Sequence, residues 1–354
     1  MISDETQAPW RRFALNFAIA AAALTLMLFG FNVTLDPFGI RASPTHAPTP
    51  LMDVNQRFMY PQVVRSGQFD SGVFGTSTIR LLDPKRLDRA FGGKFANFGM
   101  NAATPWEQLQ LATLFIRQEP APKVLIFGLD ETWCEADADR KKLTFRTFPP
   151  WLYDDEPWKG YPELLNLTTL EIAGRVALHR LGLMRERLPP NGYEIFVPDE
   201  ALYDLSRARE NIRTMARARS ETWSGPARTA RAAAAPFPAL DWLDEALTNL
   251  RPTAPVLLAF MPVHASLLPP PGSEGDRREM ACKARAAELG RTHNAAVLDF
   301  RFRSPVTVDD ANYWDGLHYR IGIAARIADG LNAAFKTGHD DPAGFYRVLN
   351  PRRQ

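Results

Sequence analysis

The run Val-Leu-Ile-Phe-Gly-Leu at residues 124–129 is short, continuous in apolar residues and followed at once by Asp130. Such a run is typical of a strand buried on both faces, as in a parallel sheet with helices on either side. Residues 255–261, Pro-Val-Leu-Leu-Ala-Phe-Met, repeat the pattern. Three further strand candidates lie at residues 69–75, 94–98 and 296–300. We therefore expect five buried strands.

Helical patterns alternate with these strands. The helix predicted at residues 106–118 has Thr104 as its N-cap and Pro105 at its first position. The other helices are expected at residues 79–90, 239–249, 277–291 and 321–335. This alternation predicts an α/β fold with a doubly wound, mostly parallel sheet. Open α/β sheets place their sites at the carboxyl ends of their strands. Four positions are expected at that edge: Ser77, Gly99, Asp130 and the loop after Met261.

Residues 132–238 interrupt the alternation. They contain an aromatic and acidic loop at 149–158 and helical patterns at 164–187 and 200–222. An Ala/Arg-rich stretch at 227–235 is typical of a solvated helix or a linker. We interpret the whole stretch as a mainly helical insertion that caps the site.

The N-terminus contains a long apolar segment. Residues 13–33 carry no charge, and about 20 residues at 1.5 Å each cross a hydrocarbon core of about 30 Å. Because no small-x-small cleavage site follows, an uncleaved anchor is favoured over a cleaved signal peptide. A buried helix of a soluble core is the third alternative. Arg11 and Arg12 precede the segment, which predicts a cytoplasmic N-terminus. We expect a single-pass protein of the inner (cytoplasmic) membrane whose C-terminal domain is periplasmic or otherwise extracytoplasmic.

The chain of 354 residues divides on this interpretation into an N-terminus, an anchor, a tether with a lead-in strand, an α/β domain in two parts, the insertion and a tail. The expected boundaries are 1–12 for the cytoplasmic N-terminus, 13–33 for the transmembrane anchor, 34–66 for the tether, 67–131 with 239–340 for the α/β domain, 132–238 for the insertion and 341–354 for the tail.

Composition limits the classes of partner. The net charge of +2 does not point to nucleic acid, and no nucleic-acid partner is expected. Cys134 and Cys282 are the only cysteines, and they pair in an oxidising compartment or remain two buried thiols. No Cys/His spacing resembles a metal site, so no metal and no cofactor are expected.

Two short segments carry residues that suggest chemistry. Ser77 follows Gly75-Thr76 at the end of a predicted strand, where its hydroxyl is exposed beside free backbone N–H groups. Asp315 precedes His318 by three residues, a spacing that can put a carboxylate beside an imidazole. Separately these are common patterns, and for each of them alone helix capping is the favoured explanation. If the fold brings Ser77 to His318, they become a nucleophile, a base and an orienting carboxylate.

Four segments appear in order, each at a predicted strand end or loop. They are Phe-Gly-Thr-Ser at 74–77, Asn-Phe-Gly-Met-Asn-Ala-Ala-Thr at 97–104, Gly-Leu-Asp at 128–130 and Trp-Asp-Gly-Leu-His at 314–318. The series resembles the SGNH (GDSL-type) hydrolase superfamily, particularly its membrane-anchored bacterial members that act on cell-envelope polymers. The resemblance covers roughly residues 68–131 and 254–335, and it implies a flavodoxin-like sheet of the SGNH-hydrolase type.

The resemblance also implies roles for individual residues. Ser77 matches the nucleophile, although Gly-Asp-Ser is commoner there than Gly-Thr-Ser. His318 matches the general base, and Asp315 holds its tautomer. The backbone N–H groups of Gly99 and Ser77 match the oxyanion donors.

One segment departs from the family pattern. Gly-Leu-Asp at 128–130 stands where the family has Gly-x-Asn, and an ionised Asp130 cannot donate to an oxyanion. Three explanations are open: Asn101 supplies the amide, Asp130 is protonated, or Asp130 turns away to bind a substrate hydroxyl. Asn101 is favoured, because it lies just after Gly99. A structural capping role for Asp130 is about as well supported as any functional one.

Three other residues are candidates for substrate binding. His264 follows a predicted strand and either lines the site or is a hydrogen-bonded loop residue. Arg80 either holds an anionic or polyhydroxylated substrate or makes an ordinary surface pair, and the surface pair is favoured. Trp314 either stacks on a sugar or belongs to the core.

The sequence therefore predicts an ester-active serine enzyme, an esterase or an O-acyltransferase, with acetyl as the favoured acyl group. The expected partners are an acylated glycan or another ester, and the membrane; protein partners are not indicated. The alternative is a catalytically weak or inactive binding or assembly subunit of the cell envelope, motivated by Asp130.

Overall fold

The computed structural model describes residues 4–223, 236–250 and 254–353. Its centre is a six-stranded sheet with the order β2-β1-β3-β4-β5-β6. The strands are β1 Ser71–Gly75, β2 Phe95–Gly99, β3 Val124–Leu129, β4 Val256–Phe260, β5 Ala296–Asp299 and β6 Arg347–Asn350. The first five are parallel and β6 is antiparallel to β5. The predicted α/β fold with a mostly parallel sheet is confirmed.

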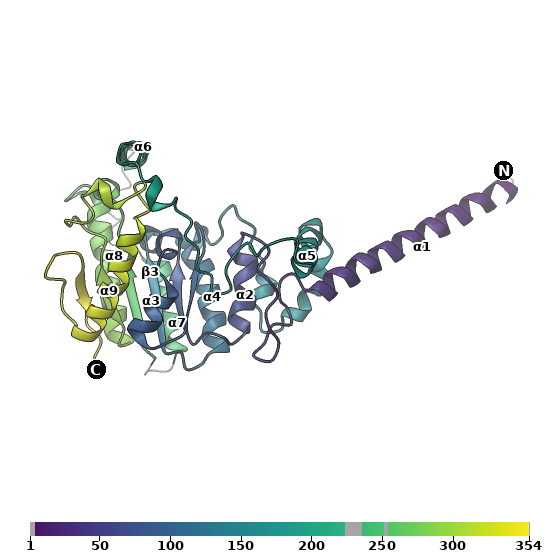
Figure 1. The fold of residues 1–354 in the computed structure, drawn as a ribbon, viewed down its shortest axis with the longest axis horizontal. Helices are drawn as coiled ribbons and strands as arrows, with labels where there is room; N and C mark the ends of the chain where they lie inside the picture. The colour runs from purple at the N-terminus through teal and green to yellow at the C-terminus, as the bar shows by residue number, and fades with distance from the viewer. Residues whose placement is uncertain (1–3, 224–235, 251–253, 354) are drawn as a thin grey trace.

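Helices cover both faces of the sheet (Figure 1). The helices α3 Pro84–Phe91 and α9 Ile321–Thr337 contact each other on one face, and the other face carries α2 Gln56–Arg65, α4 Pro105–Gln118, α7 Pro238–Thr248 and α8 Glu274–Thr292. Successive strand residues point to opposite faces. Val73 and Ile126 pack toward α3 and α9, whereas Phe74 and Phe127 pack into the core beneath α2 and α4. Burial on both faces explains why these strands are continuous apolar runs.

The helix expected at residues 79–90 is divided in two. A short 3₁₀ helix, η1 Ser77–Ile79, follows β1, and α3 begins only at Pro84. The carboxylate of Asp83 accepts a hydrogen bond from the backbone N–H of Lys85, so Asp83 is the N-cap of a new helix. Ser77 consequently lies in a tight turn of its own, directly after the strand.

The N-terminal helix α1 Asp4–Leu35 extends away from the rest of the molecule (Figure 1). Its segment Pro9–Leu35 has a mean hydropathy of 2.0 in its most apolar window, and none of that window is buried. By length and composition, one helix of the described chain is therefore apolar enough to cross a membrane.

Residues 34–66 differ from the expected tether and lead-in strand. Phe38 and Leu51 are buried in the main core, and the second part of the segment is the helix α2 rather than a strand. The carboxylate of Asp36 accepts hydrogen bonds from the backbone N–H groups of Ile40 at 2.7 Å and Arg41 at 3.0 Å, which turns the chain just after α1. The lead-in strand was a wrong prediction, because residues 56–65 form a helix that is buried along nearly its whole length and packs against α4.

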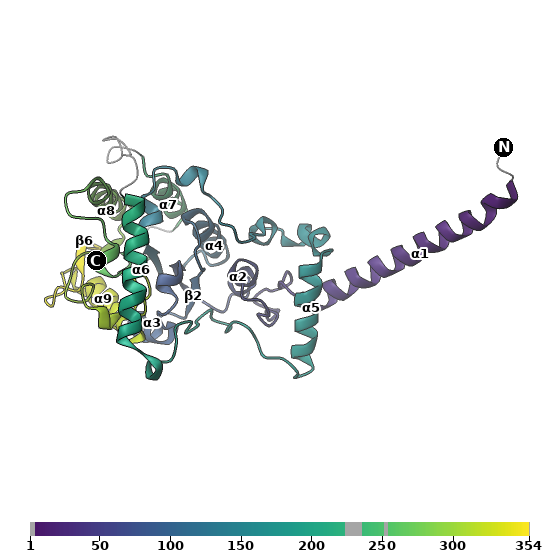
Figure 2. The ribbon, with the colours of Figure 1, turned by 90° about the horizontal axis from the view of Figure 1, so that it is seen from above.

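The insertion is largely helical and irregular. Its two long helices are α5 Leu167–Arg180 and α6 Leu205–Trp223. The helix α5 lies beside the end of α1, whereas α6 lies near α9 (Figure 2). The α6 helix contacts the short 3₁₀ helices η7 Ala265–Leu267 and η8 Asp310–Asn312. The Ala/Arg-rich stretch at 227–235 lies outside the described residues.

A disulfide and a sixth strand complete the α/β domain. Cys134, at the end of the 3₁₀ helix η2 Glu131–Cys134, forms a disulfide with Cys282 of α8, which decides between the paired and free thiols. Within the expected C-terminal tail, the strand β6 extends the sheet beyond β5. The sequence analysis missed β6, because it has only four residues and pairs on one side alone.

Candidate active site

Three glycines create the space for the turn that carries Ser77. The side chain of Ile79, two residues after Ser77, packs over Gly75, Gly99 and Gly128 at the ends of three neighbouring strands. A Cβ atom at these glycines would lie 2.7, 2.7 and 2.1 Å from atoms of Ile79. Larger residues would therefore push Ile79 outward and move the turn.

The loop that carries Asp315 and His318 is closed like a small hairpin. Tyr313 and Tyr319 form an isolated antiparallel bridge, and the N–H of Trp314 donates to the carbonyl of His318 at 2.8 Å. The hydroxyl of the buried Tyr319 donates to the carbonyl of Thr78, the residue after Ser77. This bond links the loop to η1 across 241 residues of sequence.

The structure brings the three predicted catalytic residues together. The Oγ atom of Ser77 lies 3.0 Å from Nε2 of His318. The Nδ1 atom of His318 lies 2.8 Å from Oδ2 of Asp315. The Oδ1 atom of Asp315 accepts hydrogen bonds from the backbone N–H groups of Leu317 at 2.7 Å and His318 at 2.8 Å. Both carboxylate oxygens of Asp315 thus accept hydrogen bonds. Hydrogen bonds connect Ser77 through His318 to Asp315 without a break.

The electrostatics of Asp315 fix the tautomer of His318. Burial alone would raise the pKa of Asp315, but its hydrogen bonds from the His318 ring and from two backbone N–H groups outweigh burial and lower that pKa. An ionised carboxylate only accepts, so the proton lies on Nδ1 of His318 and Nε2 is free to accept from Ser77. That is the arrangement a general base requires.

The expected oxyanion donor at Gly99 is already occupied. The N–H of Gly99 donates to Oδ1 of Asn97 at 3.0 Å. The Nδ2 atom of Asn97 in turn donates to the carbonyls of Ile79 at 2.9 Å and Leu82 at 3.0 Å. Asn97 is fully buried, so this network is part of the fold. The N–H of Gly99 is therefore not free for an oxyanion in this structure, because a buried amide side chain accepts from it.

Asn101 lies on the same sheet edge as Ser77. Gly75 and Gly99 are paired between β1 and β2, so Ser77 and Asn101 each lie two residues beyond a paired position on the same sheet edge. Oδ1 of Asn101 accepts from Nη1 of Arg80 at 2.7 Å, which fixes the orientation of the amide. Its Nδ2 has no hydrogen-bond acceptor among the residues that the structure describes.

Asp130 caps a 3₁₀ helix. Its Oδ1 accepts from the backbone N–H of Thr132 at 2.9 Å, at the start of η2. Its Oδ2 accepts from the hydroxyl of Thr76 at 3.0 Å. Asp130 therefore supports the loop before Ser77.

Arg80 is a buried residue, which corrects the favoured surface pair. It is 2% exposed, and its Nη2 pairs with the carboxylate of Glu194. Its guanidinium carbon lies 4.7 Å from the ring centroid of Phe196, and that ring lies 5.2 Å from the His318 ring. The insertion thus covers one side of the candidate site. Glu194 and Phe196 were missed by the sequence analysis, because they lie in an irregular segment without periodicity.

Loop 189–198 is attached to the edge strand β2. The N–H of Asn97 donates to the carbonyl of Asn191 at 2.8 Å. Gly192 has a φ of +72°, and a Cβ there would lie 2.1 Å from the carbonyl oxygen of Asn97. The close approach requires glycine, and it holds the segment with Glu194 and Phe196 over Arg80.

His264 and Trp314 have structural contacts. The N–H of His264 donates to the carbonyl of Gly316 at 2.9 Å, and its Nε2 lies 3.1 Å from Oδ1 of Asp310. Burial lowers the pKa of His264 even though Asp310 opposes the shift, which favours a neutral ring. Trp314 packs edge-on against Tyr203 of the insertion, with ring centroids 5.1 Å apart. Both residues support the loop at 313–319 from outside the Ser77–His318 contact.

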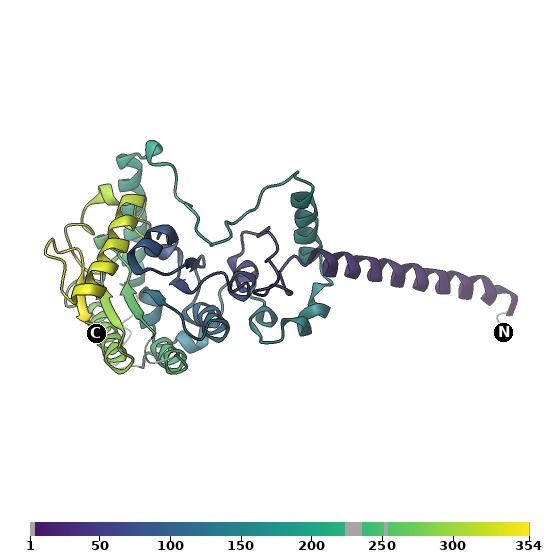
Figure 3. The same ribbon diagram turned by 60° about the horizontal axis from the view of Figure 1, so that its bottom comes forward.

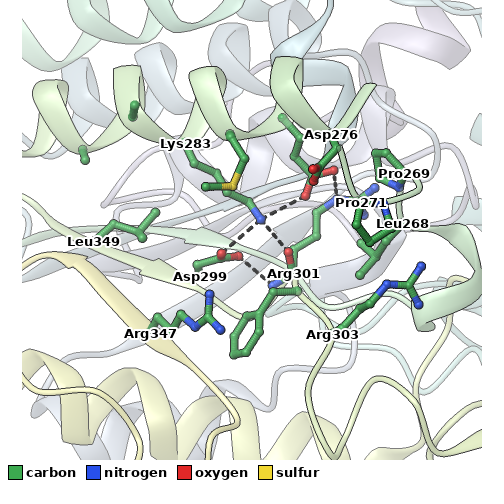
Figure 4. A pocket seen from close by; sticks show the side chains of 15 residues that line it. Leu268, Pro269, Pro271, Asp276, Lys283, Asp299, Arg301, Arg303, Arg347 and Leu349 are labelled. Atoms are coloured by element: carbon green, nitrogen blue, oxygen red, sulfur yellow. Dashed lines mark hydrogen bonds and ion pairs between the residues drawn. The ribbon is translucent and has the colours of Figure 1, made fainter. Parts of the chain in front are cut away.

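A cavity of about 630 Å³ lies away from these residues, between α8 and the β5–β6 edge. Figure 4 shows Lys283 at its centre, with Nζ 2.9 Å from Glu279 and 3.0 Å from Asp299. Four of the charged residues in its wall thus form one network, since Arg301 also lies 3.4 Å from Glu279. Among the residues that the structure describes, no group of three or more His, Cys, Asp or Glu side chains could hold a metal ion.

Comparison with known proteins does not identify the chain. No protein-family model matches the sequence, and no curated protein sequence matches it either. Its function is therefore argued from the geometry of the site.

Proposed function

We propose that this protein is a membrane-anchored, extracytoplasmic serine esterase or O-acyltransferase that acts on an acylated cell-envelope polysaccharide. The observation that carries the proposal is the hydrogen-bonded chain Ser77–His318–Asp315. Its members come from opposite ends of the sequence and meet at the carboxyl edge of a parallel sheet, where open α/β folds place their sites.

The proposed reaction has two steps. The Oγ atom of Ser77 attacks the acyl carbonyl while Nε2 of His318 takes the hydroxyl proton, and Asp315 stabilises the resulting imidazolium. The C–O bond to the sugar then breaks, His318 returns the proton to the leaving alkoxide, and an acyl-Ser77 ester remains. In the second step, His318 takes a proton from water in an esterase or from a sugar hydroxyl in a transferase, and the oxygen of that acceptor attacks the acyl carbon. The bond from the acyl carbon to Oγ then breaks, and His318 returns the proton to Ser77.

The oxyanion that forms in each step needs hydrogen-bond donors. The N–H of Ser77 and the Nδ2 group of Asn101 are the proposed donors. The bond from Arg80 to Oδ1 of Asn101 supports this assignment, because it turns the two N–H bonds of the amide away from Arg80. Asn101 would then replace the amide that Asp130 lacks.

The strand order supports the proposed SGNH-type domain, and the disulfide and α1 support the proposed extracytoplasmic compartment. The strand order β2-β1-β3-β4-β5 is that of flavodoxin-like doubly wound sheets, in agreement with an SGNH-type domain. The Cys134–Cys282 disulfide favours an oxidising compartment. The apolar segment of α1, which begins at Phe13 directly after Arg11 and Arg12, favours an uncleaved anchor with its N-terminus in the cytoplasm.

The test is hydrolysis of p-nitrophenyl acetate by the full chain in detergent. The Ser77→Ala variant should lose essentially all turnover, because Ser77 is the one hydroxyl within hydrogen-bond distance of Nε2 of His318 among the residues that the structure describes. Ser206→Ala, which removes an exposed hydroxyl of α6, is the matched control and should keep full activity. Unchanged hydrolysis in Ser77→Ala would remove the enzyme assignment.

A non-catalytic binding or assembly subunit is the second candidate. The occupied N–H of Gly99 and the acceptor-only Asp130 favour it, because both reduce the number of oxyanion donors. A fluorophosphonate probe separates the two candidates. Labelling that is present in the native chain and absent in Ser77→Ala supports the enzyme, whereas a folded native chain without labelling supports the subunit.

A further inference from the structure

The helix α5 carries an apolar face that the protein does not cover. Its buried side chains, among them Ile172, Ala173 and Val176, face the domain. On the opposite side of the helix, Leu167 is 83% exposed and Leu181, at its C-cap, is 70% exposed. The neighbouring Leu165, Leu178 and Leu183 are also exposed. A row of exposed leucines on one helix face marks an interaction surface.

This face lies at the base of α1. The side-chain amide of Asn32 donates to the carbonyl of Leu164 at 2.8 Å, and Nη2 of Arg180 donates to the carbonyl of Leu35 at 3.3 Å. Asn32 and Leu35 are buried by these contacts. Figures 2 and 3 show α5 running across the end of α1 rather than along it. A helix that crosses a membrane span in this way runs along the membrane surface.

The depth of this junction follows from the length of the apolar segment. The uncharged stretch begins at Phe13, after Arg12. A hydrocarbon core of about 30 Å takes up about 20 helical residues, and so ends near Asn32. The residue that contacts Leu164 therefore lies at the boundary between hydrocarbon and headgroups, and α5 is held at the same level.

The composition around α5 fits that boundary. Trp158, in the 3₁₀ helix η5 Pro157–Leu164 that contacts α1, is 54% exposed beside Lys159. Tryptophan is enriched at membrane interfaces, and Trp10 stands at the opposite end of the apolar segment. Residues 158–187 contain five Lys or Arg and three Glu, a net charge of +2 that suits anionic headgroups.

We propose that α5, together with η5 and residues 181–183, is a membrane-surface element whose leucines insert into the phospholipid headgroup region. It would hold the α/β domain in one orientation on the bilayer, instead of leaving it to swing about the end of α1. The inference rests on the proposed membrane anchoring of α1, and it does not depend on the catalytic chemistry.

The experiment uses the full chain in vesicles of phosphatidylcholine and phosphatidylglycerol. Single cysteines carrying an environment-sensitive fluorophore are introduced as Leu181→Cys, Leu202→Cys or Leu24→Cys. The native cysteines are joined in a disulfide and do not react. Leu202 is the matched control, since it is a leucine of the insertion that is 72% exposed and remote from α1. Leu24, within α1, reports on anchoring.

We expect a blue shift and the loss of most fluorescence at Leu181→Cys when lipids carry a shallow nitroxide quencher, with no change at Leu202→Cys. Leu24→Cys should be quenched by a deep nitroxide. If Leu24→Cys is quenched and Leu181→Cys behaves as Leu202→Cys does, the surface element is disproved while anchoring stands. Absence of quenching at Leu24→Cys would disprove anchoring itself.

A second variant tests whether the leucines are responsible. With the fluorophore at Leu167→Cys, the added pair Leu181→Glu and Leu183→Glu should abolish shallow quenching, because two carboxylates oppose insertion. Leu202→Glu in the same background should leave the quenching unchanged. A fluorophore that is shielded only in native membranes, and not in protein-free vesicles, would assign the face to a protein partner and overturn the proposal.

Discussion

The loops that begin at Asp130 and Asp315 have similar backbone hydrogen bonds but different side-chain contacts. One carboxylate oxygen of each residue accepts from the backbone just ahead of it: Asp315 from the N–H groups of Leu317 and His318, and Asp130 from the N–H of Thr132. They differ in what the second oxygen contacts. In Asp315 that oxygen meets the ring of His318, and in Asp130 it meets the hydroxyl of Thr76.

The comparison separates a local capping interaction, which both aspartates make, from the contact with His318, which only Asp315 makes. An aspartate that caps its own loop is common and carries no functional information by itself. The role of Asp315 comes from its partner, because His318 is held against Ser77 by a long-range contact between Tyr319 and Thr78. Among the residues that the structure describes, no imidazole contacts Asp130. Its carboxylate instead accepts from Thr76 and stabilises the loop before Ser77. The variants below test this difference.

Asp315→Asn is expected to have the largest effect. The amide keeps the shape of the side chain but removes the charge that stabilises the imidazolium and selects the Nδ1–H tautomer. The kcat for p-nitrophenyl acetate should fall by about 10⁴-fold with little change in KM. The same substitution in the other loop, Asp130→Asn, is the matched control, and it should change kcat by less than about tenfold. Equal losses in both variants would contradict the comparison.

Asn101→Ala should have the next largest effect. Removal of one oxyanion donor costs about 10²–10³-fold in kcat. The hydrogen bond from Arg80 fixes the side-chain amide of Asn101, which we propose as the oxyanion donor besides the N–H of Ser77. Asn249→Ala, which removes an exposed amide at the C-cap of α7, is the control and should keep kcat within about threefold. If Asn101→Ala is as active as the native chain, the oxyanion is bound elsewhere.

The pH dependence of the unfolding free energy should report the hydrogen bonds of Asp315. Hydrogen bonds lower the pKa of Asp315 below its unfolded value of about 4. A carboxyl group with a lowered pKa stabilises the folded state above the unfolded pKa, and this contribution is lost as the pH falls through the folded pKa. The difference in unfolding free energy between the native chain and Asp315→Asn should be constant from about pH 5 upward and shrink below about pH 4. Chemical denaturation over this range measures it, and a difference that grows on acidification would contradict the sign.

Much of the fold could be predicted, because parallel strands buried on both faces leave a clear signal. The strand predicted at 124–129 is β3 with the same bounds, and 255–261 contains β4. The strand β6 and the helix α2 were missed or mistaken, because each depends on a neighbour distant in sequence. The apolar segment of α1 leaves the strongest signal of all, since a helix long and apolar enough to cross a membrane can be recognised without its neighbours.

The site could be predicted only in part, for a related reason. Ser77, Asp315 and His318 lie at strand ends or in a short motif, so topology alone brings them together. Whether an N–H group is free depends on side-chain conformations that a sequence does not specify. The side chain of Asn97 occupies the N–H of Gly99, and Glu194 approaches Arg80 from an irregular segment.

Asp130→Ala should have the smallest effect and bears most directly on the comparison. Loss of the bonds to Thr132 and Thr76 removes a helix cap, so the free energy of unfolding should fall by about 1 kcal/mol. The kcat should change little, because the carboxylate does not contact the Ser77–His318 pair. Asp130→Asn retains the capping oxygen and should recover most of the stability, as denaturant titration would show. A more than tenfold rise in kcat on Asp130→Asn would instead show that the charge opposes the oxyanion, and that position 130 belongs to the reacting site.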